Sequence, residues 1–323
     1  MSALSRRQPL AGAAAAAALP RTAAALPRTA AAQPRRYGLT PVEVAAGLWM
    51  IEGKREVFSR ENGGDIVNIA LLSTDQGALV IDSGSTSAMG AEIRAFADQR
   101  LGGLLATVNT HHHPDHWFGN APLADRPVLA LAATAATCAE FAQDYAETLY
   151  SILGSWISGT RTLPATGTVE AGPRVFGGRS LRMLPLAGHT SADLAILDEA
   201  TGVLIAGDLV FLDRAPSLPD ADFATWLSAL DQLDALGRIA VLPGHGPFHR
   251  EGEGIAQTRA YLTATRDRLR LAAELGLTPV EAMAAGPVPE FAGLGANPEE
   301  YLRSVVRRWG AEETGVLPVV GGA

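Results

Sequence analysis

Residues 110–116 read Thr-His-His-His-Pro-Asp-His, and four of these side chains have the chemistry of metal ligands. The spacing His111-x-His113-x-Asp115-His116 supplies three imidazoles and one carboxylate from a single short segment. In an extended segment alternate side chains point the same way, so His111 and His113 can converge on one ion. The chain then turns at the proline, so that Asp115 and His116 can face a second ion. One loop therefore begins two metal half-sites.

Three further candidate ligands follow this loop, and each stands next to a glycine. They are His189 in Ala-Gly-His-Thr, Asp208 in Ala-Gly-Asp and His245 in Pro-Gly-His-Gly. Catalytic zinc takes three ligands from His, Asp or Glu and keeps a position open for water, whose pKa it lowers to about 7. A histidine-rich set without cysteine fits that chemistry and suffices for two ions. The sequence therefore predicts a two-zinc hydrolase.

The pattern of apolar residues predicts alternating strands and helices around these ligands. The run 104–108 indicates a buried strand that ends where the histidines begin, which places them on a loop at a strand's C-terminal edge. Further strands are predicted at 42–50, 66–81, 128–130, 181–186, 194–196, 203–205 and 239–242, and helices at 88–100, 132–146, 254–275 and 297–309. Asp222 can cap another helix, which carries Trp226 on its apolar face. Residues 145–169 interrupt the periodicity, which favours a lid or a substrate wall.

In order and separation these elements resemble the metallo-β-lactamase superfamily over roughly residues 40–250. Asp82, which ends Ala-Leu-Val-Ile-Asp-Ser-Gly, matches the first motif of that superfamily, and the loop at 110–116 matches the second. His189, Asp208 and His245 match the third, fourth and fifth motifs. The resemblance implies an α+β fold class: a four-layer αββα sandwich over residues 42–250, with a C-terminal helical extension over residues 251–323.

The resemblance also assigns roles to the ligands. The first zinc would be held by His111, His113 and His189, and the second by Asp115, His116 and His245. Asp208 would bridge the two ions. A hydroxide between the zincs, oriented by Asp115, would attack an ester, thioester or lactone carbonyl, with Asp115 or Asp208 carrying the proton. Asp82 would hydrogen-bond around the ligand loop, although a carboxylate that caps the turn after its own strand explains this residue equally well.

Asp208 stands where the most familiar zinc β-lactamases have a cysteine, so the ligand set resembles that of glyoxalase II and of the third β-lactamase subclass. With the arginine-rich start and the segments 62–66 and 208–211, the chain most resembles the quinoprotein relay system zinc metallohydrolases, a group associated with periplasmic quinoprotein dehydrogenases. This resemblance implies a small-molecule substrate but does not identify it. Besides a β-lactamase, the alternatives are a mononuclear iron persulfide dioxygenase, which would use His111, His189 and Asp208, and a non-enzymatic periplasmic accessory protein that binds zinc or quinone.

Composition and the amino terminus bear on location and partners. A chain of 323 residues with 47% hydrophobic content can bury a large core. Its net charge of −8 argues against nucleic acid as a partner.

The amino terminus predicts an export signal over residues 1–32 and a linker over residues 33–41. The evidence is a twin-arginine pattern around Arg6, a weakly apolar run at 11–19 and small residues at 30–32. We therefore expect a periplasmic protein without membrane insertion. A disordered alanine-rich tail is the alternative for this segment. The oligomeric state is unknown.

Several single residues are expected outside the ligand set. Cys138 is the only cysteine, which suggests a small buried apolar residue. His112 is expected to point away from both metals into solvent, and His249 to be structural. Arg214 is expected at the surface rather than as an anchor for a substrate carboxylate. Three aromatic residues could line a pocket or belong to the buried core: Trp117, Phe118 and Trp156.

Overall fold

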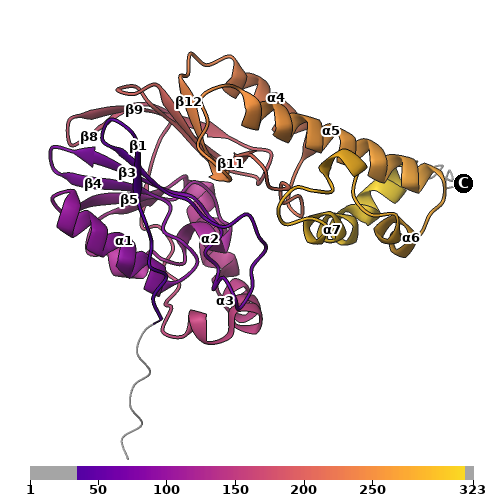
Figure 1. Cartoon of the computed structure of the whole chain (residues 1–323), viewed down its shortest axis with the longest axis horizontal. Coiled ribbons are helices and arrows are strands. Elements are labelled where there is room, and N and C mark those ends of the chain that lie inside the picture. Colours follow the sequence, from indigo (N-terminus) through magenta and orange to yellow (C-terminus); the bar gives the residue numbers. More distant parts are fainter. Residues whose placement is uncertain (1–34, 317–323) are drawn as a thin grey trace, which may run out of the picture. The chain divides into compact units, whose positions relative to one another are not determined.

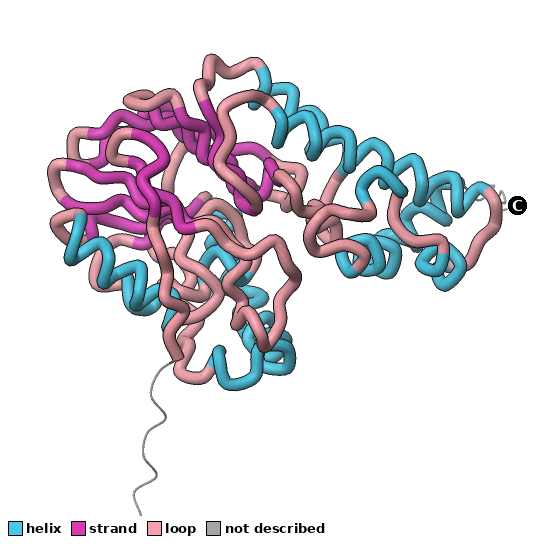
Figure 2. The backbone as a smooth tube through the Cα atoms, viewed as in Figure 1, coloured by secondary structure: helices cyan, strands magenta, loops and turns pink. Residues whose placement is uncertain are grey.

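The computed structural model describes residues 35–316, so the predicted export signal lies outside the described residues. Two β-sheets face each other and carry helices on their outer faces (Figures 1 and 2). The chain therefore has the predicted α+β architecture with two central sheets, followed by further helices. Within the described range, no helix is both long and apolar enough to span a membrane.

The first sheet contains seven strands in sequence order, of which the first four are antiparallel and the last three run parallel to β4. They are β1 (Val42–Ala45), β2 (Leu48–Ile51), β3 (Ile69–Thr74), β4 (Gly77–Ile81), β5 (Leu104–Val108), β6 (Val128–Ala130) and β7 (Gly167–Thr168). The second sheet has the order β12-β11-β10-β9-β8, in which only β11 and β12 are parallel. Its strands are β8 (Gly172–Phe176), β9 (Arg179–Leu186), β10 (Asp193–Asp198), β11 (Val203–Phe211) and β12 (Ala240–His245).

The described α-helices are α1 (Ser87–Arg100), α2 (Pro114–Trp117), α3 (Ala132–Leu153), α4 (Phe223–Asp234), α5 (Glu253–Glu274), α6 (Pro279–Ala284) and α7 (Glu299–Val316). Short 3₁₀ turns lie at Ala121–Leu123, Gly154–Ile157 and Pro289–Phe291. The side chain of Asp222 accepts a hydrogen bond from the backbone of Thr225, which confirms the predicted cap of α4.

Alternating side chains explain the layers. In β4, Leu79 and Ile81 belong to the core between the two sheets, whereas Val80 packs with Ile93 of α1 on the outer face. On the other side of the sandwich, Trp226 of α4 packs among residues of the second sheet. Strands β4, β10, β11 and β12 are covered on both faces and are buried along their whole length. Strands β8 and β9 instead keep an exposed face. This arrangement is the four-layer sandwich that the sequence predicts.

The helices after β12 form a smaller apolar cluster of their own. Leu269 of α5 packs with Tyr301 and Trp309 of α7 in this cluster. A buried ion pair between Arg214, just after β11, and Glu300 ties α7 to the sandwich, with their side chains 3% and 1% exposed. The expectation of a surface position for Arg214 was therefore wrong, because Glu300 provides a buried partner for its charge.

Several element boundaries differ from expectation, for example those of α3 and β11. Helix α3 continues past residue 146 to Leu153, because Leu149 and Leu153 extend its buried face. Gly154, with φ of 60°, then ends it, so only the later part of 145–169 is irregular. Strand β11 continues past residue 205, and Asp208 lies inside this strand rather than at its end.

The guanidinium of Arg179 connects the two sheets. This residue of β9 binds both carboxylate oxygens of Asp198 on the neighbouring strand β10. It also donates to the backbone oxygens of Ala46, Gly47 and Ser73 in the first sheet, at distances of 2.9–3.2 Å. The Asp198 side chain is fully buried. This network therefore joins the rims of the two sheets through one side chain.

Candidate metal centre

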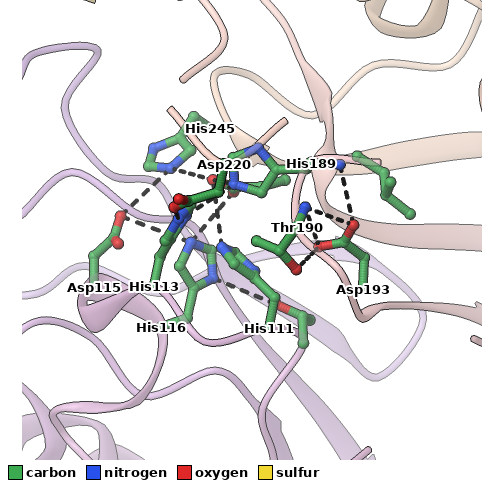
Figure 3. Close-up of polar contacts among 12 residues, drawn as sticks. His111, His113, Asp115, His116, His189, Thr190, Asp193, Asp220 and His245 are labelled. Carbon is green, nitrogen blue, oxygen red and sulfur yellow. Dashed lines mark hydrogen bonds and ion pairs between the residues drawn. The ribbon is translucent and has the colours of Figure 1, made fainter. Parts of the chain in front are cut away.

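The seven candidate ligands lie close together. Figure 3 shows six of them around a common centre: His111, His113, Asp115, His116, His189 and His245. The loop after β5 and helix α2 supply four of the seven, the turn between β9 and β10 supplies His189, β11 supplies Asp208, and the end of β12 supplies His245. Two groups made only of candidate ligands have ligand atoms within 4.8 Å of one another: one contains His111, His113, His189 and Asp208, and the other Asp115, His116 and His245. A third group, of His112, His113 and Asp220, shares His113 with the first.

Asp208 lies between the two groups. Its Oδ2 is 3.3 Å from Nε2 of His189 in the first group and 3.3 Å from Nε2 of His245 in the second. Its Oδ1 is 3.2 Å from Nε2 of His116. This central position suits a carboxylate that contacts two ions at once.

The unsatisfied polar atoms fit a bound cation. Nε2 of His111, Nε2 of His116 and Oδ1 of Asp208 are buried, and none has a hydrogen-bond partner among the described residues. Buried polar atoms normally have a hydrogen-bond partner. Buried imidazole and carboxylate atoms that converge without one are those that a metal can ligate. Burial lowers the pKa of His111 well below its usual range, which favours the neutral imidazole that binds metals. The pKa of His116 is raised instead, because the carboxylates of Asp208 and Asp82 outweigh the effect of burial. Imidazole and carboxylate donors suit zinc and related divalent cations.

Asp82 makes its hydrogen bonds to the ligand loop. Its Oδ1 accepts from the backbone of Thr110, and its Oδ2 lies 2.7 Å from Nδ1 of His116. The carbonyl of Ile66 lies 2.6 Å from Nδ1 of His245 in the same way. In both histidines the bonded Nδ1 leaves Nε2 facing the centre, which is how outer groups orient metal-binding imidazoles. Of the two interpretations of Asp82, these contacts favour the one around the ligand loop.

Sequence reasoning missed Asp220, which contacts a ligand from the loop between β11 and α4. Its Oδ2 lies 3.0 Å from Nε2 of His113, which leaves Nδ1 of His113 toward His189 at 2.9 Å. The hydrogen bond from His113 lowers the pKa of Asp220 to about 2, so this group is a carboxylate. No motif marks Asp220, because the contact joins positions 107 residues apart.

A second missed residue, Asp193, holds the turn that carries His189. Its carboxylate accepts from the backbone nitrogens of His189 and Thr190 and from the Thr190 hydroxyl (Figure 3). It lies four residues after His189, at the start of β10. The polar segment Gly-His-Thr-Ser-Ala-Asp was a local signal that could have identified it.

His112 is not the solvent-exposed residue that was expected. It is only 7% exposed, and its ring belongs to a third group of converging ligand atoms, with His113 and Asp220. It stacks on Tyr145 of α3 with ring centroids 6.3 Å apart. The packing of α3 on this side of the loop accounts for its burial. Burial lowers the pKa of His112 to about 3, so the ring is neutral at physiological pH.

A cavity of about 890 Å³ opens over the ligands. His113, Asp115, Asp208 and His245 form part of its lining, together with residues of α3, α7 and the loop before β3. The aromatic residues suggested as a pocket wall are not among its lining residues. Trp117 and Phe118 are fully buried in a core cluster, and Trp156 packs against that cluster. The core interpretation was therefore the correct one for these three.

Cys138 and His249 have the buried and structural roles that were expected for them. Cys138 is buried, and burial raises the pKa of its thiol to about 12, so it is an unreactive apolar residue. His249 accepts from the backbone nitrogen of Gly254 at the start of α5. Both residues serve packing and local structure.

A family model described as the metallo-beta-lactamase superfamily matches residues 62–245, more than half of the chain. The chain belongs to this superfamily. The match begins before β3 and ends at His245, so it includes all seven candidate ligands.

Curated proteins with similar sequences are named hydroxyacylglutathione hydrolases. The protein from Methylococcus capsulatus is 24% identical over 270 residues, which cover 76% of this chain and 96% of that protein. The protein from Synechococcus sp. (strain JA-2-3B'a(2-13)) is 30% identical over 134 residues, which cover 41% of this chain. The chain thus spans only 45% of the length of that relative.

Solved structures of the superfamily share the fold. A beta-lactamase domain protein from Burkholderia ambifaria superposes with a TM-score of 0.60 at 23% identity, over 84% of this chain and 88% of that one. A metallo-beta-lactamase from Pontibacter korlensis gives a TM-score of 0.57 at 21% identity, over 70% and 99%. The family, these relatives and the His/Asp cluster together indicate a metal-dependent hydrolase with a dinuclear site.

Replacement of Asp220 by alanine is expected to weaken metal binding at the His113 group by about 10- to 100-fold, because the imidazole loses the carboxylate that orients it. Competition with a fluorescent zinc chelator measures the change. Asp222→Ala, two residues away, is the matched control. It removes the cap of α4, at a cost of roughly 1 kcal/mol in stability, but should leave metal affinity unchanged. Equal affinities in the two variants would contradict the orienting role.

Proposed function

We propose that this chain is an exported dinuclear zinc hydrolase that cleaves an ester, a thioester or a lactone. The observation that carries the proposal is the position of Asp208 between two complete groups of buried ligands, directly below a cavity large enough for a small-molecule substrate. The curated relatives are named for the hydrolysis of a glutathione thioester, which supports acyl transfer to water as the reaction class.

Two divalent cations at this site would supply an acidified water and polarise the carbonyl that it attacks. The chain contributes two carboxylates beside that water. Asp115 and Asp208 both line the cavity, and their side chains are 7% and 3% exposed. Either can hold the proton that leaves the attacking water and pass it to the leaving group. The surrounding imidazoles fix both carboxylates in place, since Oδ2 of Asp115 lies 3.5 Å from Nε2 of His245.

The completeness of the second ligand group favours two zinc ions over a single iron. A mononuclear iron site built from His111, His189 and Asp208 would use none of the second ligand group, which consists of Asp115, His116 and His245. Those three residues are buried and converge as closely as the first group. Their imidazoles are also oriented by Asp82 and by the carbonyl of Ile66. Such orientation is expected of ligands.

The setting of the reaction rests on the sequence. The arginine pair at residues 6–7, followed by an alanine-rich run, supports export to the periplasm by the twin-arginine route. The segments 62–66 and 208–211 support kinship with the quinoprotein relay system metallohydrolases, and so a role beside a periplasmic quinoprotein dehydrogenase. Fractionation of cells that produce the full chain tests the location, and recovery in the cytoplasm alone would contradict it.

Metal analysis combined with a substrate panel tests the function. We expect about two zinc ions per chain and hydrolysis of p-nitrophenyl esters, lactoylglutathione or lactones that is lost with a chelator and restored by zinc. Nitrocefin and a phosphodiester in the same panel separate β-lactamase and nuclease activity from acyl hydrolysis. One iron per chain with oxygen consumption on a persulfide would identify a dioxygenase instead. Two zinc ions without turnover of any substrate would indicate a binding protein.

A further inference from the structure

The cavity over the ligands has a polar floor and an apolar wall. The floor contains His113, Asp115, Asp208 and His245. The wall is built from segments far apart in the sequence: Phe58 before β3, Phe141, Leu149 and Ile152 on α3, and Leu302 and Val306 on α7. A substrate whose reacting carbonyl lies at the floor therefore has the rest of the molecule in contact with the apolar side chains of the wall.

Part of this wall is exposed to solvent without a substrate. Phe141 is 38% exposed, Ile152 37% and Val306 63%, and these side chains come from two different helices. Single exposed apolar side chains are ordinary, but a contiguous group around a concave site marks a surface that a ligand covers. The group is continuous with the candidate ligands, so its occupant is the substrate of that site.

Besides the carboxylates of the floor, the cavity is lined by charged residues of both signs, including Arg214 and Asp220. Those contributed by α7 are of both signs: Glu299, Glu300, Arg303 and Arg307. Glu300 is already paired with Arg214 and Arg303, at 3.3 and 3.1 Å. The wall therefore offers apolar contact as its main source of binding energy.

We propose that the wall binds the acyl chain of the substrate, and that the substrate class is a medium-chain aliphatic ester or thioester. This inference rests on the proposed function. A cavity of about 890 Å³ is far larger than an acetyl group needs and lies within the range for drug-sized ligands. Each methylene that leaves water for the wall adds binding energy, up to the length at which the wall ends.

A series of p-nitrophenyl esters tests the proposal with the zinc-loaded full chain. From acetate to octanoate, kcat/KM should rise by about two- to fourfold for each added methylene, the range expected for partial to full burial. Thioesters of the same acyl groups should follow the same order. Concentrations are kept below those at which the longer esters form micelles.

Substitutions on the wall give a sharper test. Val306→Asn on α7 and Ile152→Asn on α3 should each lower the ratio of octanoate to acetate kcat/KM by about three- to tenfold, because an amide replaces apolar contact. Val280→Asn on α6 is the matched control for Val306→Asn. Val280 is 68% exposed, close to the 63% of Val306, but does not line the cavity. The control should leave the whole ester series unchanged.

The outcomes separate the inference from the function on which it rests. A flat series with chelator-sensitive turnover of acetate would overturn the acyl-chain proposal and leave the hydrolase proposal standing. A rising series that neither wall variant alters would likewise overturn the assignment of this wall. Failure to hydrolyse any ester or thioester of any length would overturn the acyl-chain proposal, and failure on the lactones as well would overturn both proposals.

Discussion

Asp208→Ala should lower turnover by roughly 10⁴-fold or more, the loss seen when a catalytic unit loses one of its members. The carboxylate lies between the two ligand groups, within 3.3 Å of imidazole nitrogens from His189, His245 and His116. Its removal takes away the negative charge between the groups and the one side chain placed to contact both ions. His113→Ala should have an effect of the same order, because it removes a ligand of the first group.

Metal content, circular dichroism and turnover of the best panel substrate measure this effect together. The fold should be retained, because Asp208 contributes to a buried polar centre and not to the apolar clusters. Asp213→Ala is the matched control: this carboxylate follows the same strand, is half exposed and pairs with Arg55 at the surface. It should keep both metals and full activity. Wild-type turnover in Asp208→Ala or His113→Ala would reject the assigned centre.

Arg179→Ala should destabilise the protein by about 3–5 kcal/mol, the cost of leaving a buried charge without its partner. Asp198 is fully buried and would keep only the hydroxyl of Thr201 as a side-chain partner. The backbone oxygens of Ala46, Gly47 and Ser73 would also lose their donor. The first effect acts within the second sheet, and the second effect acts on the contact between the two sheets.

Urea unfolding followed by tryptophan fluorescence measures the loss. Arg182→Ala is the matched control, because it lies on the same strand and pairs with Glu199, yet the two side chains are 46% and 34% exposed. An exposed ion pair contributes at most about 1 kcal/mol. Equal destabilisation by the two variants would show that burial of the Arg179 pair has no special weight.

Local patterns explain why the ligand cluster could be predicted, whereas the four-layer sandwich was implied by the resemblance to the superfamily. The loop at 110–116 contains four ligands, and a buried apolar strand precedes it, so both the chemistry and the position at a sheet edge are readable within a dozen residues. The strands nearest the site, such as β4 and β5, are apolar runs because they are covered on both faces. His189, Asp208 and His245 were found because each follows a glycine near a predicted strand.

The residues that were missed or misplaced depend on distant partners. Asp220 meets His113 across 107 positions, and Arg214 meets Glu300 across 86. An arginine is normally exposed, and nothing near position 214 indicates that α7 will cover it. His112 is buried for the same kind of reason, since its ring stacks on Tyr145, which the packing of α3 brings beside the ligand loop. Such contacts are decided by the packing of helices on the sandwich, which periodicity along the chain does not report.

The far wall of the cavity belongs partly to α7, whereas none of the seven candidate ligands does. The candidate metal ligands and part of the surface that would select the substrate are thus encoded in different stretches of the gene. Mutation in the later stretch can alter which molecule is accepted without moving a single coordinating atom. Natural selection can therefore redirect this scaffold toward new metabolites by remodelling one peripheral helix.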